Sequence, residues 1–243
     1  MRLTSINCEQ IAPPTWESNT IPDLLGQEVH LWRIGIRLPN HKLSTLEELL
    51  STEERQRANK YLREQDRIRF IIGHACTKKL ISQYLNLEIS QVTLKNGSNG
   101  KPYVSPLYKL YFNLSHSGDW VFIAFGAEEL GVDLEEIAGN FITDALLEQC
   151  FHGQELKVIR DSSDPTAEFF KFWTRKEAFL KATGNGMVDD LNQFTCIDES
   201  QEFSFPTLSN EMSWHLKSFL MDQTYAVSLC AANPLTTIRF FDY

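Results

Sequence analysis

Residues 113–137 read NLSHSGDWVFIAFGAEELGVDLEEI, and this stretch carries two turns between runs of alternating apolar residues. Alternation with period two is typical of strands, and SHSGD and the Glu128–Leu130 segment have the composition of turns. We therefore predict strands over Leu110–Leu114 and Trp120–Phe125, and a third strand in GVDLEEI. The centre of the chain is thus predicted to be a β-sheet.

Helical patterns lie on both sides of this stretch. Ser44 with Glu47, and Ser51 with Glu54, match the capping box that opens a helix. The helix after Ser51 is expected to be basic, with six cations between Arg55 and Arg69 against four acids. Further predicted elements are a strand from Val29, a helix over 67–85, a hairpin in LKNGSNGKPYV, helices near 142–149, 153–160 and 167–182, and a closing hairpin with TYAVSLCAA.

Two segments, DWVFIAFGA and TYAVSLCAA, share an aromatic residue followed by alternating apolar residues late in each half of the chain. Together with the mixed elements, they favour an α+β fold of two related halves. No flexible linker separates the halves, so we expect them to pack directly together. We predict a weakly structured surface arm over residues 1–27, a front half over 28–129 and a rear half over 130–243.

The composition is that of a globular protein, with 42% hydrophobic and 23% charged residues among 243. The longest apolar run, residues 120–127, is far shorter than the about 20 residues that cross a bilayer. The N-terminus has no apolar stretch of the signal-peptide kind. The five cysteines are scattered and form no CxxC pair, which argues against zinc sites and disulfide frameworks. We expect a cytoplasmic protein without a membrane partner.

The net charge of −9 argues against a general nucleic-acid binder. Its distribution is uneven: residues 1–110 carry 15 Lys and Arg against 11 Asp and Glu, whereas residues 111–243 carry 8 against 21. This asymmetry suggests that the front half binds an anion and the rear half a cation. Unequal surfaces without function are the alternative.

Two acids in the third strand point to a metal. Asp133 and Glu135 are two residues apart, so their carboxylates project from one face of the strand. Oxygen ligands at this spacing suit Mg²⁺, which shares its shell with water and phosphate oxygens. A strand that merely runs into an acidic loop has the same pattern.

The helical stretch FFKFWTRKEAFLKATG, residues 169–184, places two charges among apolar side chains. At about 100° per residue, Lys176 and Glu177 both fall inside the arc of Phe and Trp residues. Buried charges need an opposite charge or a metal, so both require a partner. Lys181 follows Glu177 by one turn, and an ordinary surface ion pair between these two residues would explain Lys181 but not Glu177.

The sequence NLSHSGDW offers polar groups at a strand end. Ser115 and His116 are neighbours on a strand and point to opposite faces, a poor geometry for a serine–histidine catalytic pair. They fit better as donors to an anion, with Lys101 of the Gly-rich loop adding charge. His116 in a purely structural role is the alternative.

Taken in order, GKP, FNLSHSGDW, GVDLE and FWTRKEAFLKATGNG resemble the motifs of the Sfp-type 4′-phosphopantetheinyl transferases over about residues 51–232. The resemblance implies a monomer of two pseudo-symmetric α/β halves with coenzyme A between them. Such an enzyme moves the phosphopantetheine arm to a serine of an apo carrier protein and releases 3′,5′-ADP. The carriers serve fatty-acid, polyketide or nonribosomal peptide synthesis.

The resemblance also implies residue roles. Asp133, Glu135 and Glu177 match the acids that bind Mg²⁺, for which Mn²⁺ is a possible substitute, and Glu177 and Lys181 match the catalytic pair. The residues that match the coenzyme A site are Arg57, Arg69, Lys101, Ser115 and His116. Two departures concern the outer nucleotide contacts: Glu54 replaces a lysine of one well-studied pattern, and Phe70 replaces a hydroxyl residue.

Two other functions remain open from the sequence. One is an acyl hydrolase built on Ser115 or Ser117 with His116. The other is an adaptor without catalysis, which would dock acidic carrier proteins on the basic segment Arg55–Arg69.

Overall fold

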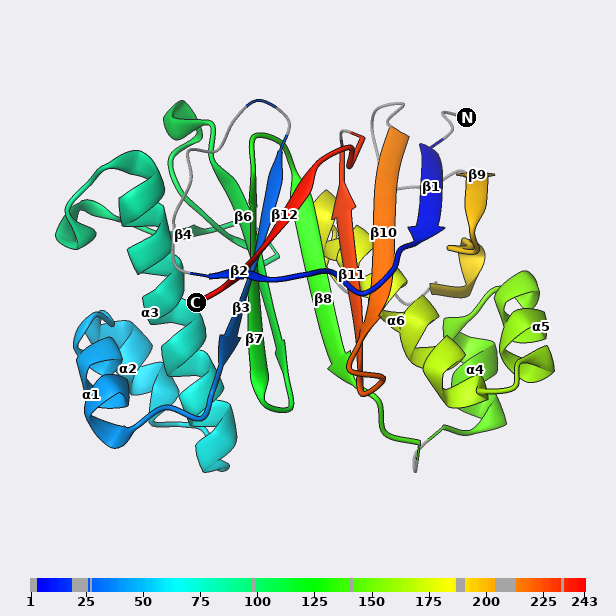
Figure 1. Cartoon of the computed structure of the whole chain (residues 1–243), viewed down its shortest axis with the longest axis horizontal. Coiled ribbons are helices and arrows are strands. Elements are labelled where there is room, and N and C mark those ends of the chain that lie inside the picture. Colours follow the sequence, from blue (N-terminus) through cyan, green and yellow to red (C-terminus); the bar gives the residue numbers. More distant parts are fainter. Residues whose placement is uncertain are drawn as a thin grey trace.

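The computed structural model describes residues 4–18, 26, 28–97, 99–139, 142–186, 191–203, 213–232 and 234–243. They form a mixed α/β structure with two five-stranded sheets that lie side by side (Figure 1). In spatial order, the first sheet consists of β8 (Leu130–Glu136), β11 (Tyr225–Ala231), β10 (Ser213–Met221), β1 (Thr4–Gln10) and β9 (Glu199–Phe203). The second consists of β2 (Glu17–Ser18), β12 (Ile238–Asp242), β3 (Val29–Gly35), β7 (Trp120–Gly126) and β6 (Tyr111–Ser117).

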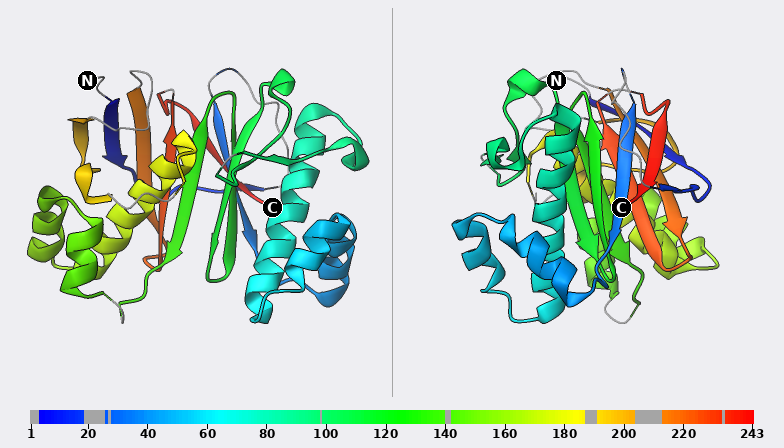
Figure 2. Two further views of the ribbon diagram at one scale, coloured as in Figure 1. Left: turned by 180° about the vertical axis from the view of Figure 1, so that it is seen from behind. Right: turned by 60° about the vertical axis from the view of Figure 1, so that its left-hand side comes forward.

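Each sheet carries one long helix. Helix α3 (Glu64–Leu85) packs on β6 and β7, and α6 (Pro165–Thr183) packs on β8, β10 and β11. Figure 2 shows α3 and α6 at opposite ends of the molecule, each against its own sheet. The remaining helices and the small hairpin are α1 (Asn40–Glu48), α2 (Thr52–Ala58), α4 (Asp144–Cys150), α5 (Gly153–Asp161), three short 3₁₀ helices η1 (Ile89–Gln91), η2 (Pro106–Tyr108) and η3 (Leu191–Gln193), and strands β4 (Lys95–Asn96) and β5 (Pro102–Tyr103).

The prediction that residues 1–27 form a weakly structured arm is wrong for residues 4–10, which form strand β1. Strand β1 lies between β10, to which it is parallel, and β9, to which it is antiparallel. Its alternate residues Ile6 and Cys8 are buried in the core beneath α6. Burial of this one face fixes the strand, although the segment as a whole is polar.

Two helix boundaries also differ from the sequence prediction. Helix α1 starts at Asn40, four residues before Ser44, whose hydroxyl donates to the Asn40 carbonyl inside the helix instead of capping it. The expected basic helix is divided, because α2 ends at Ala58 and α3 begins at Glu64. The capping box of Ser51 and Glu54 is present as predicted, and so is the termination of α6 at Gly184, whose φ is +69°.

No helix in the described part of the chain combines the length and the hydrophobicity that crossing a membrane requires.

Candidate active site

The two sheets meet where their edge strands β6 and β8 run beside each other, and side chains bridge this seam. Asn113 Oδ1 accepts from the Val132 N–H at 2.9 Å, and Ser115 Oγ accepts from the Leu134 N–H at 3.3 Å. Ser117 Oγ accepts from the Glu136 N–H at 3.0 Å, which continues the same register. Alternate side chains of β6 thus bond the free backbone edge of β8, which explains the spacing of polar residues in NLSHS.

At the centre of the seam, Asp133 is bound from both sides. Lys181 Nζ of α6 donates to Asp133 Oδ1 at 2.5 Å, and Ser115 Oγ donates to the same oxygen at 2.9 Å. Lys181 Nζ also lies 3.1 Å from Ser115 Oγ. The three residues, far apart in sequence, form one polar cluster. The ion pair of Lys181 therefore reaches across to β8, and the alternative of a surface pair with Glu177 alone does not explain it.

A glycine allows α6 to come this close to β8. A Cβ atom at Gly131 would collide with backbone atoms of Ala178 and Ala182. Only glycine permits such an approach, so the first residue of the GVDLE motif sets the distance at which Lys181 reaches Asp133.

The other two acids lie in the same electrostatic environment. Burial raises the pKa of Glu135 to about 7, and the Asp133 carboxylate adds repulsion. Burial likewise raises the pKa of Glu177, again with repulsion from Asp133, while Lys181 acts in the opposite sense. Acids of raised pKa around a single lysine are typical of a functional site rather than of a structural ion pair.

These acids fit a hard cation in their chemistry. Two buried oxygens, Asp133 Oδ2 and Glu177 Oε1, have no hydrogen-bond partner among the described residues, which is costly unless a cation or a substrate satisfies them. Carboxylate oxygens are the ligands that Mg²⁺ uses. No three His, Cys, Asp or Glu side chains in the described ranges are grouped tightly enough to hold a metal by themselves. These acids thus supply oxygen donors for a cation but do not form a complete metal-binding site by themselves.

Of the expected coenzyme A residues, Ser115 belongs to the cluster around Asp133, and Lys101 lines the same cavity as Glu177 and Lys181. Arg69 of α3 donates to the Gly118 carbonyl at 2.6 Å and to Asp66 at 2.5 Å, next to the turn that follows β6. His116 is exposed on the face of β6 opposite to Ser115. Desolvation by its surroundings lowers the pKa of His116, and Arg69 and Lys181 add repulsion. Two cations, Arg69 and Lys181, thus act on His116, while the Asp66 carboxylate acts on its pKa in the opposite sense.

Arg57 lies on α2 and is exposed, with its guanidinium 5.3 Å from the centre of the Phe70 ring. Phe70, one of the two departures from the family pattern, is therefore covered by a cation rather than open to solvent.

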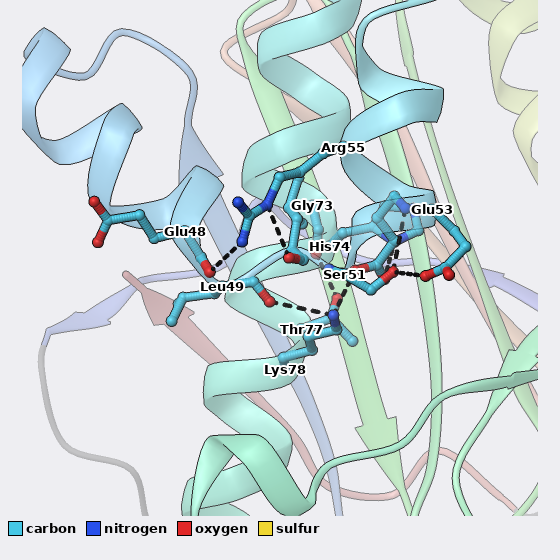
Figure 3. A network of polar contacts seen from close by, with 11 residues as sticks. Glu48, Leu49, Ser51, Glu53, Arg55, Gly73, His74, Thr77 and Lys78 are labelled. Atoms are coloured by element: carbon cyan, nitrogen blue, oxygen red, sulfur yellow. Dashed lines mark hydrogen bonds and ion pairs between the residues drawn. The ribbon is translucent and has the colours of Figure 1, made fainter.

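The other departure, Glu54, belongs to a network between α1, α2 and α3 (Figure 3). Its carboxylate forms an ion pair with Lys78, caps the Ser51 N–H at 2.7 Å and lies 3.2 Å from His74 Nδ1. Burial would raise the pKa of Glu54, but the hydrogen bonds from His74, Lys78 and Ser51 outweigh it and lower the pKa to about 2. Lys78 also donates to the Leu49 carbonyl. Glu54 therefore connects α2 to α3, and Lys78 extends the network to the residue that follows α1.

Lys101 is bound by protein groups. Its Nζ donates to Glu129 at 2.7 Å, to the Leu130 carbonyl at 3.0 Å and to the Ala182 carbonyl at 3.2 Å. It thereby ties the β4–β5 hairpin to the start of β8 and to the end of α6.

Lys176, the other charge that the sequence places among the apolar residues beside Glu177, has an ion-pair partner in the structure. Lys176 is fully buried and forms an ion pair with the equally buried Glu155 of α5 at 2.9 Å. Its Nζ also donates to the carbonyls of Leu191 and Phe194. No local sequence pattern predicts this contact, because Glu155 is an ordinary acid in the first turn of α5.

The hydrolase interpretation finds no support in the geometry. Within the described residues, neither Ser115 nor Ser117 forms a hydrogen bond with His116; their hydroxyls donate to Asp133 and Glu135, at 2.9 Å in each case. A serine held by a carboxylate and separated from its histidine by the strand is not an activated nucleophile.

Comparison with known proteins finds two matching family models. Residues 129–230 match the model of the 4′-phosphopantetheinyl transferase superfamily, and residues 39–128 match that of the 4′-phosphopantetheinyl transferase N-terminal region. The 4′-phosphopantetheinyl transferase HetI of Nostoc sp. is 31% identical over 90% of this chain and 94% of its own length.

Two Bacillus proteins are also similar. The 4′-phosphopantetheinyl transferase Sfp of Bacillus subtilis is 27% identical over 76% of this chain and 83% of its own length. The 4′-phosphopantetheinyl transferase psf-1 of Bacillus pumilus is 30% identical over 79% of this chain and 83% of its own length. The chain therefore belongs to the 4′-phosphopantetheinyl transferase family, of the Sfp type, and is a transferase.

Proposed function

We propose that this enzyme transfers the 4′-phosphopantetheine arm of coenzyme A to a serine of an apo carrier protein and releases 3′,5′-ADP. The observation that carries the proposal is the cluster of Lys181 and Asp133 between two acids of raised pKa. Transfer of a phosphoryl-type group needs positioning and neutralisation of charge more than it needs a covalent intermediate, and this cluster supplies both.

In this proposal Glu177 accepts the proton of the attacking serine. Burial and repulsion from Asp133 raise the pKa of Glu177, which makes its carboxylate a stronger base than an exposed glutamate. Lys181 neutralises the charge that develops on the pyrophosphate as its P–O bond breaks, and it protonates the leaving 3′,5′-ADP. The serine proton thus goes to Glu177, and the leaving phosphate is balanced by Lys181.

Asp133, Glu135 and Glu177 would hold Mg²⁺, or Mn²⁺ in its place, because their oxygens are the donors that lack partners or carry raised pKa values. When bound, the ion supplies Lewis-acid stabilisation of pyrophosphate oxygens. It would also satisfy Asp133 Oδ2 and Glu177 Oε1, the two buried oxygens that have no hydrogen-bond partner among the described residues.

The cations of the front half would bind the nucleotide. Arg57, Arg69, Lys101, Ser115 and His116 are its proposed contacts, and Arg69, Lys101 and Ser115 are held in place by protein partners. A charge-assisted hydrogen bond to a 3′-phosphate contributes about 1.5–3 kcal/mol. Hence His116→Ala weakens coenzyme A more than dephospho-coenzyme A in calorimetric titrations; equal losses make His116 structural.

We further propose that the enzyme is monomeric and that its halves, residues 28–129 and 130–243, are pseudo-symmetric with coenzyme A between them. Strands β3, β6 and β7 with α3 come from the first half and β8 to β11 with α6 from the second, which supports this proposal, while β12 of the second half joins the first half's sheet beside β3. Carriers of fatty-acid, polyketide or peptide synthesis are the acceptors.

The test is incubation with coenzyme A, Mg²⁺ and an apo carrier protein, followed by mass spectrometry of the carrier. A gain of one phosphopantetheine group on the carrier serine is expected. Turnover of simple esters without this gain supports a hydrolase instead. A carrier that binds but stays unmodified supports an adaptor.

A further inference from the structure

One surface next to the site has an unusual composition. Residues 89–118 contain three lysines and no Asp or Glu, although the whole chain has a net charge of −9. Lys95 and Lys109 are exposed on this surface. Leu107 is 91% exposed, and Tyr103 and Tyr108 are 40% and 45% exposed. Large apolar side chains grouped in this way among cations are typical of a surface that recognises a partner.

The same segment encloses an apolar cavity. The β4–β5 hairpin, the start of β6 and the end of α6 surround a space of about 270 Å³. Its walls include Pro102, Val104, Leu110 and Phe112, and Tyr103 and Pro106 stand at the margin where the exposed Leu107 and Tyr108 follow. The space is large enough for one or two apolar side chains, and Asn99, Lys101, Glu129 and Thr183 also line it.

The cavity is continuous with the candidate active site. A second cavity, of about 240 Å³, is lined by Glu177 and Lys181. The two cavities share Asn99, Lys101 and Gly184 in their walls. Asn99 Nδ2 donates to the Gly184 carbonyl at 2.8 Å, which holds the hairpin against the end of α6.

We propose that the surface formed by Lys95, Tyr103, Leu107, Tyr108 and Lys109, with the apolar cavity beside it, docks the carrier protein. This inference rests on the proposed function, in which the carrier must bring its serine to Glu177. The partner is an acidic protein that inserts an apolar side chain near its acceptor serine into the cavity. Its acidic residues face Lys95 and Lys109, and Leu107 with the two tyrosines covers its apolar face.

The first test compares two leucines of equal exposure. Leu107→Asp removes the centre of the docking surface, whereas Leu62→Asp changes a leucine that is 101% exposed in the turn between α2 and α3. Neither side chain is packed, so both variants are expected to fold. Because a central interface residue contributes strongly to binding, Leu107→Asp raises the KM for the apo carrier about tenfold or more. Leu62→Asp leaves the KM for the carrier and for coenzyme A within about twofold.

Binding is measured separately from chemistry with a carrier whose acceptor serine is replaced by alanine. Its affinity for the enzyme, measured by calorimetry, falls in Leu107→Asp and in Lys109→Glu but not in Leu62→Asp. The loss in Lys109→Glu shrinks as salt is raised, because an exposed charge pair is screened.

The possible results separate the two proposals. A wild-type enzyme that modifies no apo carrier refutes the proposed function itself. An active enzyme in which Leu107→Asp and Lys109→Glu bind the alanine carrier as well as the wild type does overturns only the docking surface. If Val104→Phe, which fills the cavity, raises the KM for coenzyme A and not that for the carrier, the cavity holds the pantetheine arm and the inference is wrong.

Discussion

Glu54 in the front half and Glu135 in the rear half are both partly buried carboxylates next to a lysine, yet their environments have opposite effects. Hydrogen bonds and an ion pair to Lys78 and His74 lower the pKa of Glu54 to about 2. At Glu135, burial and the neighbouring Asp133 raise the pKa to about 7. The first group stabilises the fold, whereas the second is held in an unfavourable state. A site for a cation or a substrate is thus recognised by buried carboxylates whose charge the surrounding protein does not stabilise.

The largest expected difference between the two regions is in catalysis. Glu177→Gln keeps the shape of the side chain but removes its charge and basicity, so kcat should fall about 10²–10⁴-fold. Affinity for coenzyme A should change far less. Steady-state kinetics of carrier modification checks both values, with Glu54→Gln as the control of the same chemical change in the other region. A kcat of Glu177→Gln within about twofold of the wild type removes the general base from the mechanism.

For the free energy of unfolding, the substitution in the front half is expected to have the larger effect. Glu54→Gln breaks a pair whose side chains are only 17% and 10% exposed, so it should lower the free energy of unfolding by about 2–3 kcal/mol, less than a fully buried pair loses. Metal-free Glu135→Gln should be neutral or stabilising, since it removes a repulsive charge. Urea unfolding of both variants in EDTA measures the difference. Equal destabilisation by the two substitutions would contradict the comparison.

The comparison also predicts two pH windows. Glu135 binds its proton more tightly in the folded protein than in the unfolded chain, so the free energy of unfolding falls as the pH rises from about 5 to about 7. Glu54 has the opposite sign, and its contribution is lost as the pH falls from 4.5 toward 2. Melting temperatures in EDTA should therefore drop between pH 5 and 7.5, and Glu135→Gln, but not Glu54→Gln, should flatten that drop.

The acids of the rear half could be identified from the sequence, but the network around Glu54 in the front half could not. The period-two pattern of GVDLE identified Asp133 and Glu135 on one face, and the helical arc identified Glu177 as a charge without a partner. Glu54 was noticed only as a departure, because its partners His74 and Lys78 lie on another helix and no local pattern connects them.

The same limit applies to β1 and to Lys181. The alternation of Ile6 and Cys8 was present in the sequence, but seven polar-rich residues reveal a strand only when neighbouring strands bury one face. For Lys181, the local neighbour was Glu177, whereas the actual partner, Asp133, is 48 residues away. Contacts of this kind depend on how closely α6 packs on β8, which Gly131 controls.

The central claim is that Asp133, Glu135 and Glu177 form one cation site. Its most direct test is titration of the protein with Mn²⁺ in the presence of coenzyme A, followed by electron paramagnetic resonance. The account predicts one bound Mn²⁺ per chain in the wild type and in Glu54→Gln, and loss of that ion in Glu135→Gln. Unchanged Mn²⁺ binding in Glu135→Gln would contradict the account.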